Sequence, residues 1–455
     1  MKPLLLWSDI LIYLLVVALC LFFLQLRRDP QTREHWRRVF SSRLGMVTCT
    51  LIMAYVGIAL LDSLHFRRAL DPVTGGGGEI YYDNKVTSVL DVMLAGMGER
   101  FERTYSAPFA LQSFEKQDKK DEHGVAYRDF PLLEHAGRHL QAPADRWPDV
   151  LGKSLEALLL GLVLSAAVIG LQWYCLRGSA LPWSASWLTQ AGVICVGVWL
   201  VSISRYYHVL GTDLGGADVA YQSIKGVRTG VLLGTLSTLI MLPIAVSLGV
   251  MAGYFKGWVD DVVQYLYTTL SSIPGILLIA ASVLLFQVYI DLHPDYFSIG
   301  LEKADARFIA LCFILGVTSW SSLCRLIRAE TLKISQLGYV QAAHAFGVSN
   351  SRILLRHVVP NVSHIILITF VLDFSALVLA EAILSYIGVG IDPNMASWGN
   401  MINGARSELS REPAVWWTLS GAFLFMFGLV LSANLFSDLV RDAFDPRSAA
   451  GSGTP

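Results

Sequence analysis

The chain has 455 residues, of which 54% are hydrophobic and only 16% are charged, and its formal net charge is −1. Ordinary soluble domains carry about 25% charged residues, so this composition excludes a protein that is water-soluble throughout. The near-neutral charge argues against a nucleic-acid partner. The six cysteines form no Cys-x-x-Cys pair, so we expect neither a disulfide framework nor a metal site.

Long apolar runs predict the membrane-spanning helices. A hydrocarbon core about 30 Å thick is crossed by about 20 apolar residues in a helix. The sequence therefore predicts an all-α polytopic membrane protein with about nine spans, near residues 4–26, 44–62, 151–176, 187–204, 228–252, 262–290, 307–324, 362–388 and 415–437.

Basic residues in the short loops predict how these spans are oriented. Loops on the cytoplasmic side of a membrane hold an excess of Lys and Arg. Six arginines lie between residues 27 and 43, and five Lys and Arg side chains lie between residues 325 and 356. We therefore expect the N-terminus and residues 63–150 to lie outside, and the C-terminus and residues 338–361 to lie in the cytoplasm.

Residues 63–150 form a predicted extracytoplasmic insertion. Part of it has apolar residues at helical spacing, namely Val86, Val89, Leu90, Met93, Leu94, Met97 and Phe101. Two interpretations stay open for the insertion. It is either a small cap packed on the outer face of the membrane domain or a docking surface for a soluble partner.

The segment 338–361 is a polar, basic insert between two predicted spans. Residues 341–346 favour a helix, and Gly347 suits the left-handed residue that ends one. Ser349 is placed to cap a second helix, which Pro360 is expected to stop.

Small residues on the first of these helices indicate what the insert does. Ala343 and Gly347 lie four residues apart and share a helix face with almost no side chain, which favours close approach of another surface. The alternative is a connecting helix pair that lies flat on the membrane, with Gly347 as a plain C-cap. Spacing alone leaves both interpretations open.

The insert resembles the coupling loop of ABC-importer permeases, whose pattern is Glu-Ala-Ala-x3-Gly-x9-Ile-x-Leu-Pro. Here Gln341-Ala342-Ala343, Gly347 and Pro360 keep that spacing. Gln341 replaces the family's Glu, and His357 stands where many families have Ile. The His-x-x-Pro-Asn sequence at 357–361 is similar to the dipeptide, oligopeptide and nickel branch of these permeases.

Other segments resemble the same branch in the same order. They are residues 211–219 (an outer segment), 252–260 (the first cytoplasmic turn), 379–401 (a re-entrant stretch) and 441–447 (a C-terminal signature). Together they cover about 205–447, and their co-occurrence is far more specific than any one match. The basic stretch 36–40 also resembles the family's N-terminal helix.

The resemblance implies the function and the partners. The fold implied is an ABC-importer permease-type helical bundle, and the cargo implied is a peptide or a peptide-like solute. The partners implied are a second permease subunit, two cytoplasmic ATPase subunits and an extracytoplasmic solute-binding protein, in a bacterial inner membrane. The residues implied to couple the chain to the ATPase are Gln341, Ala342, Ala343, Gly347, Arg352, Arg356, His357 and Pro360.

The same resemblance divides the chain. The predicted parts are an additional helix with a basic linker (1–43), a first core helix (44–62), the insertion (63–150), an additional helix pair (151–204), the permease core (205–447, with the coupling loop at about 325–361) and a tail (448–455). No phosphate-binding loop occurs in the sequence, so we expect no nucleotide site, catalytic residue, metal or cofactor in this chain.

Two carboxylates in a predicted span suggest a rival mechanism. A central charge is unfavourable by about 2.5–3.5 kcal/mol on insertion scales, so Asp373 and Glu381 need an explanation. One is a proton-coupled secondary transporter that uses both residues. The other is a structural role or a lining of the transport pathway, where Pro274 is expected to kink a helix.

Overall fold

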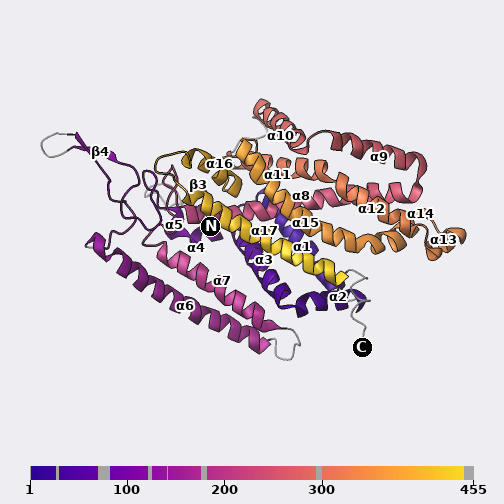
Figure 1. Ribbon diagram of the computed structural model, residues 1–455, viewed down its shortest axis with the longest axis horizontal. Helices are drawn as coiled ribbons and strands as arrows, with labels where there is room; N and C mark the ends of the chain where they lie inside the picture. Colours follow the sequence, from indigo (N-terminus) through magenta and orange to yellow (C-terminus); the bar gives the residue numbers. More distant parts are fainter. Residues whose placement is uncertain are drawn as a thin grey trace, which may run out of the picture. The chain divides into compact units, whose positions relative to one another are not determined.

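The computed structural model describes residues 2–26, 30–69, 82–120, 126–140, 142–175, 182–293 and 300–444 (Figure 1). The predicted tail 448–455 and the last residues of the 441–447 signature lie outside these ranges. The chain forms two compact units. Unit 1 comprises residues 1–13, 40–230 and 396–432, and unit 2 comprises residues 14–39, 231–395 and 433–455.

Unit 1 combines membrane helices with a small sheet. Its helices are α3 (Arg43–Asp62), α4 (Val89–Met93), α5 (Ala95–Gly98), η1 (Pro143–Asp145), α6 (Arg146–Cys175), α7 (Trp183–Ile203) and α16 (Trp398–Glu408). Its strands are β1 (Lys2–Pro3), β2 (His65–Ala69), β3 (Tyr82–Ser88), β4 (Gln117–Lys120) and β5 (Ala126–Asp129). The order β1-β2-β3 is antiparallel, and β4 and β5 form a separate hairpin.

Unit 2 is helical throughout the residues described. It contains α9 (Gly257–Ser272), α10 (Gly275–Leu292), α11 (Gly300–Ser319), α12 (Ser321–Ile334), α13 (Gly338–Ala345), α14 (Asn350–Ile353), the π-helical turn η3 (Leu354–Val358) and α15 (Val359–Ile387). Four further helices contribute residues to both units: α1 (Trp7–Leu26), α2 (Pro30–Ser41), α8 (Val219–Phe255) and α17 (Trp417–Phe444).

Most predicted spans appear as single long helices. In the described part of the chain, seven helical segments are long and apolar enough to cross a membrane, or eight if the bent pair α11 and α12 forms one span. The prediction of about nine differs at two places. The predicted span 262–290 is divided in two, and of α1 (Trp7–Leu26) only the part Trp7–Val17 enters this count, as a shorter apolar helix.

Pro274 divides the predicted span 262–290. A proline has no backbone N–H to donate, and it disfavours helical geometry at the residue before it. Ile273 is accordingly extended, with φ −93° and ψ 132°, and Pro274 begins α10 as its N-cap. The expected kink is therefore a complete break between α9 and α10.

The helix predicted across residues 86–101 is wrong in extent. Val86 belongs to strand β3, where it pairs with Arg67 of β2, and only the short helices α4 and α5 follow. Leu90 and Leu94 are buried, whereas Phe101 is 57% exposed. Apolar residues that alternate in the strand and then repeat in a helix mimic one longer helical pattern.

The start of the chain pairs with the insertion. Strand β1 is antiparallel to β2, with Lys2 opposite Arg67 and Pro3 opposite Phe66. Since β2 follows α3 directly, the chain start and the first strand of the insertion lie on the same side of unit 1. Which side of the membrane this is stays a prediction.

Helices α6 and α7 pack tightly along their length, as Figure 1 shows. A Cβ on Gly161 of α6 would lie 2.9 Å from the Cα of Cys195 on α7, so only glycine allows this approach. The indole of Trp199 donates to the hydroxyl of Ser154 at 3.0 Å. Small residues and interhelical hydrogen bonds of this kind hold helices together in lipid, where apolar burial alone gives little driving force.

Candidate functional site

Helix α13 ends as the sequence predicts. Gly347 has φ +76°, the left-handed conformation that glycine adopts without a steric penalty. The amide of Gly347 donates to the carbonyl of His344, and the amide of Val348 donates to that of Ala343, at 3.0 and 3.1 Å. These two bonds form a Schellman motif, so α13 has a fixed end.

The second half of the loop differs from the prediction at Pro360. Ser349 occupies the N-cap position of α14 with an extended backbone, although its side chain makes no capping hydrogen bond. Beyond Ile353 the helix widens into η3 and continues as α15, so Pro360 lies in the first turn of α15 and does not stop the helix. A π-helical turn relieves the clash between a proline ring and the preceding turn, which is why the chain stays helical.

The His-x-x-Pro-Asn sequence ties the two parts of the loop together. The side-chain amide of Asn361 donates to the carbonyl of His357 at 2.6 Å and to the hydroxyl of Tyr339 at 2.9 Å. Tyr339 lies on α13, and its ring centroid is 6.0 Å from that of the half-buried His357. Asn361 thus satisfies a carbonyl beside the proline and fixes α13 against the start of α15. Sequence reasoning did not single out Tyr339 or Asn361.

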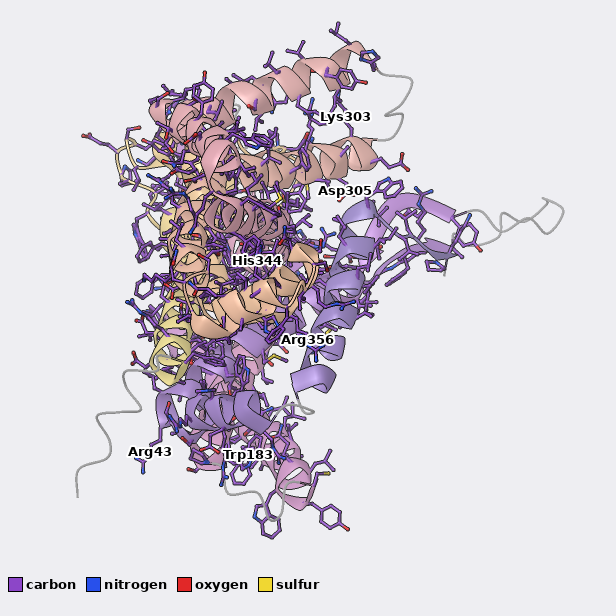
Figure 2. The ribbon with its side chains drawn as sticks, turned by 90° about the vertical axis from the view of Figure 1, so that its right-hand side faces the viewer. Arg43, Trp183, Lys303, Asp305, His344 and Arg356 are labelled. Carbon is purple, nitrogen blue, oxygen red and sulfur yellow. The ribbon has the colours of Figure 1, made fainter. Side chains whose placement is uncertain are left out.

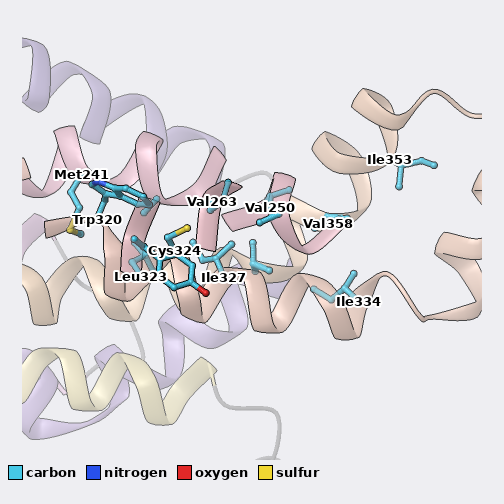
Figure 3. Packing of buried hydrophobic residues seen from close by; sticks show 14 of the residues in the cluster. Met241, Val250, Val263, Trp320, Leu323, Cys324, Ile327, Ile334, Ile353 and Val358 are labelled. Atoms are coloured by element: carbon cyan, nitrogen blue, oxygen red, sulfur yellow. The ribbon is translucent and has the colours of Figure 1, made fainter. Parts of the chain in front are cut away.

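A buried apolar cluster forms the base of the loop (Figure 3). Val340 of α13, Ile353 of α14 and Val358 of η3 are at most 2% exposed. They join Leu323 and Ile327 of α12 in one cluster. Burial on this scale stabilises by about 1.5–3 kcal/mol for each large aliphatic side chain. The loop is therefore an ordered part of unit 2.

Close packing between α8 and α12 supports the same base. A Cβ on Gly253 of α8 would lie 2.7 Å from the carbonyl oxygen of Arg328, so no larger residue fits without movement. The guanidinium of Arg328 donates to both carboxylate oxygens of Asp260 on α9, at 2.5 and 2.6 Å. Two parallel charge-assisted bonds fix orientation as well as distance. The 252–260 motif thus has a structural role beside the loop.

The outward side of the loop exposes both apolar and basic groups. Phe346 is 88% exposed at the end of α13, and Leu355 is 72% exposed on η3. Gln341, Ala342 and Gly347 are also exposed, whereas Ala343 is half-buried against the cluster. Phe346 is the most exposed large apolar side chain in the part of the chain that the structure describes. The sequence signal for it is an aromatic residue directly before the helix-ending glycine.

Two arginines flank this surface. Arg352 and Arg356 are exposed, and neither forms an ion pair with any residue in the described ranges. Figure 2 labels Arg356 together with His344 of α13. Beside them a hollow of about 360 Å³ is lined by Tyr254, Phe255, Lys256, Ser335, Val340, Gln341, His344 and Asn350. The loop therefore exposes Phe346, two arginines without an ion pair in the described ranges, and a recess, all on one ordered base.

Comparison with known proteins decides the family. Residues 245–449 match the family model described as "Binding-protein-dependent transport system inner membrane component". The chain is 33% identical over 241 residues to the oligopeptide transport system permease protein OppC of Mycobacterium bovis, covering 53% of this chain and 76% of that protein. It is 32% identical over 240 residues to the glutathione transport system permease protein GsiD of Pectobacterium atrosepticum, covering 53% and 73%.

The chain belongs to this family of binding-protein-dependent inner-membrane permeases. It is a multi-pass inner-membrane subunit of an ABC importer, which works with ATPase subunits and a solute-binding protein. ATP hydrolysis takes place in separate subunits of such a transporter. The family match begins within α8, so the insertion and the α6–α7 pair lie outside it.

The carboxylates of α15 do not form a pair in this permease. Glu381 is buried, and its carboxylate accepts a hydrogen bond from Ser385 at 2.8 Å. Asp373 is half-buried near the middle of α15 and has no hydrogen bond or ion pair with a residue the structure describes. Eight residues separate them, which is about 12 Å along a helix. Direct proton transfer from one to the other is excluded in this conformation.

A buried charge network lies in unit 1 of this permease. The guanidinium of Arg228 on α8 donates to Asp9 at 2.7 Å, to Ser8 at 2.8 Å and to Ser63 at 3.1 Å. Asp9 is fully buried and also lies 2.8 Å from His65 of β2. Sequence reasoning noted no partner for these groups, because Asp9 and Arg228 are 219 residues apart.

His208 joins the insertion to the segment that precedes α8. Its ring bonds to Asp218 at 2.8 Å and lies 3.5 Å from Glu102 of the insertion, an ion-pair distance. Burial alone disfavours the charged ring, but the hydrogen bonds and charges of Asp218 and Glu102 outweigh it and raise the pKa of His208 to about 9. The ring is therefore a cation at neutral pH.

This shift predicts a pH-dependent stability. A folded-state pKa above the unfolded value of about 6.5 stabilises the fold fully below pH about 6.5, and this contribution is lost as the pH rises through about 9. The contribution of His208 is on the order of 3 kcal/mol. We expect the thermal midpoint to fall between pH 7 and 9.5 in the wild type. In His208→Gln it should start lower and fall by much less, and equal pH profiles for the two proteins would contradict the assignment.

Proposed function

We propose that this permease imports peptides or peptide-like solutes and is driven through the loop at 338–361. The observation that carries the proposal is the surface made by Phe346, Gly347 and the arginines Arg352 and Arg356, on a base that is buried and hydrogen-bonded. The relatives named for oligopeptide and glutathione transport support the class of solute. The solute itself is selected by the external binding protein.

The proposed assembly contains a second permease subunit, two cytoplasmic ATPase subunits and the solute-binding protein. In it the loop and the C-terminus face the cytoplasm, while the N-terminus and the insertion face outward. ATP draws the ATPases together, and their different affinities for two positions of the loop shift the spans between inward-facing and outward-facing forms. Gln341, Ala342, Ala343 and Gly347 are the proposed contacts, with His357 and Pro360 fixing the loop geometry.

Arg352 and Arg356 have a separate part in this proposal. They lie on successive turns beside the exposed Leu355, where an acidic rim on the ATPase would complement them. Exposed charges at the edge of an interface affect association rate and salt dependence more than affinity. Their proposed role is therefore to orient the ATPase, while Phe346 and Gly347 form the centre of the contact.

The energy source tests this proposal directly. We expect uptake by the complete transporter in proteoliposomes to require ATP on the side of the membrane where the ATPase subunits lie. Uptake should persist when a proton ionophore removes the pH gradient. Asp373→Asn should retain ATP-driven uptake within about threefold. The proton-coupled alternative predicts the reverse: uptake that survives ATP depletion, stops with the ionophore and fails in Asp373→Asn.

A further inference from the structure

A basic hollow lies at the ends of α6 and α7 that adjoin the insertion. Its volume is about 320 Å³, and it is lined by Arg100, Glu134, His135, Arg138, His139, Arg205 and Tyr206. All of these residues belong to unit 1, and none belongs to the family match at 245–449. The transport mechanism proposed above does not use this hollow.

The charges in the hollow favour an anion. Its one lining carboxylate, Glu134, already accepts a hydrogen bond at 2.9 Å from Arg103, which does not line the hollow. Arg100 donates to the backbone carbonyl of Arg205. Arg138 and Arg205 are exposed, and their guanidinium groups make no ion pair within the described ranges. Three arginines and one carboxylate, which is already hydrogen-bonded to a fourth arginine, therefore line the hollow.

The rim of the hollow is built from fixed groups. The amide of Gly137 donates to the carbonyl of Tyr206 at 3.0 Å, which joins the insertion to the end of α7. His139 bonds to Asp149 of α6 at 2.6 Å, and Tyr207 donates to the same carboxylate at 2.6 Å. These bonds connect α6, α7 and the insertion around the hollow, so the arginines project from an ordered frame.

The position of the hollow is that of a membrane interface. Arg205 and Tyr206 directly follow the last turn of α7, and Lys153 of α6 lies 3.8 Å from the Tyr206 ring centroid. Trp147 lies in the first turn of α6 and is 54% exposed, with Arg146 stacked on its ring. Basic and aromatic side chains gather where helices leave the hydrocarbon. On the face of α6 that carries Lys153, exposed leucines follow at helical spacing, 7, 11 and 18 residues further on: Leu160, Leu164 and Leu171.

We propose that this hollow binds the phosphate headgroup of an anionic phospholipid, in the leaflet on the insertion side. Arginine matches phosphate because its planar guanidinium donates two parallel hydrogen bonds to the oxygens. The acyl chains of the same lipid would lie along the leucines of α6. A free phosphate ion would contact the arginines alone, and a soluble acidic protein would not contact leucines that lie within the bilayer. The lipid uses both.

Lipid binding to the full-length chain, purified in mild detergent, tests the site. The probes are phosphatidylglycerol, phosphatidylcholine and inorganic phosphate, and the readouts are retained lipid in native mass spectrometry and the shift of the thermal midpoint. The test variant is Arg138→Gln/Arg205→Gln. The control is Arg128→Gln/Arg411→Gln, which removes two exposed arginines that do not line the hollow.

We expect the wild type and the control to bind phosphatidylglycerol in preference to phosphatidylcholine. The test variant should bind phosphatidylglycerol about thirtyfold more weakly, because it lacks two interfacial arginines that each contribute about 1 kcal/mol to anionic-lipid binding. Equal binding by test and control variants would overturn the proposal. So would full displacement of the lipid by inorganic phosphate at millimolar concentration.

Discussion

Replacing Gly347 by Asp is expected to lower ATP-driven uptake more than tenfold while the chain still reaches the membrane. The left-handed backbone at this position admits Asp and Asn more readily than other side chains, and a Cβ there meets no atom of the chain within 4 Å. The substitution therefore leaves the fold nearly unchanged. The carboxylate of the introduced Asp, however, would lie beside Phe346 on the surface proposed to contact the ATPase. A charge buried there without a partner is unfavourable by about 2–5 kcal/mol.

Gly347→Asn is the matched control, because its side chain has nearly the same size and shape without the charge. We expect uptake to fall in the order Gly, Asn, Asp, with ATP hydrolysis in the Asp variant no longer stimulated by the loaded binding protein. The measurement is paired uptake and ATPase activity in proteoliposomes, with membrane content checked by immunoblot. Wild-type uptake by the Asp variant would rule out a coupling role for this surface.

Replacing Arg228 by Met is expected to lower the free energy of unfolding by about 3–5 kcal/mol. The Arg228 side chain is 7% exposed and the Asp9 side chain is fully buried, so the substitution leaves a buried carboxylate with only His65 beside it. Breaking a buried ion pair from one side is unfavourable on this scale because the remaining charge has lost its compensation. Thermal unfolding in detergent measures the effect.

Two further variants separate this network from ordinary surface charge. Arg128→Met breaks an ion pair with Asp118 in which both side chains are more than 70% exposed, and it should change stability by less than about 1 kcal/mol. Asp9→Asn/Arg228→Met removes both charges and should recover part of the stability. An Arg228→Met protein as stable as Arg128→Met would mean that the network does not hold the chain start against α8.

Local rules were sufficient where a single segment determines its own structure. The bilayer thickness fixes the length of an apolar helix, so α3, α6, α7, α8, α15 and α17 follow from their composition. Gly347 could be predicted as a helix end because a left-handed residue favours glycine whatever lies around it. The spacing of Gln341-Ala342-Ala343, Gly347 and Pro360 identified the family for the same reason. These are properties of short stretches.

Local rules failed where a break or a partner depends on neighbours. Pro274 and Pro360 each follow a helical segment, but with different results. Pro274 divides a predicted span, whereas Pro360 lies within a helix that continues. The difference is η3, whose wider turn accommodates Pro360, with Asn361 bonded across it to the His357 carbonyl. No pattern in the sequence distinguishes the two cases.

The sequence by itself determined the spans, the family and the end of α13, because each depends on residues within a few turns of one another. Only the tertiary structure decided that Asp9 pairs with Arg228, that Phe346 lies outward from a buried base and that three arginines surround one hollow. Such contacts join residues that are far apart along the chain. Burial and pairing depend on how the helices pack, so composition and spacing do not predict them.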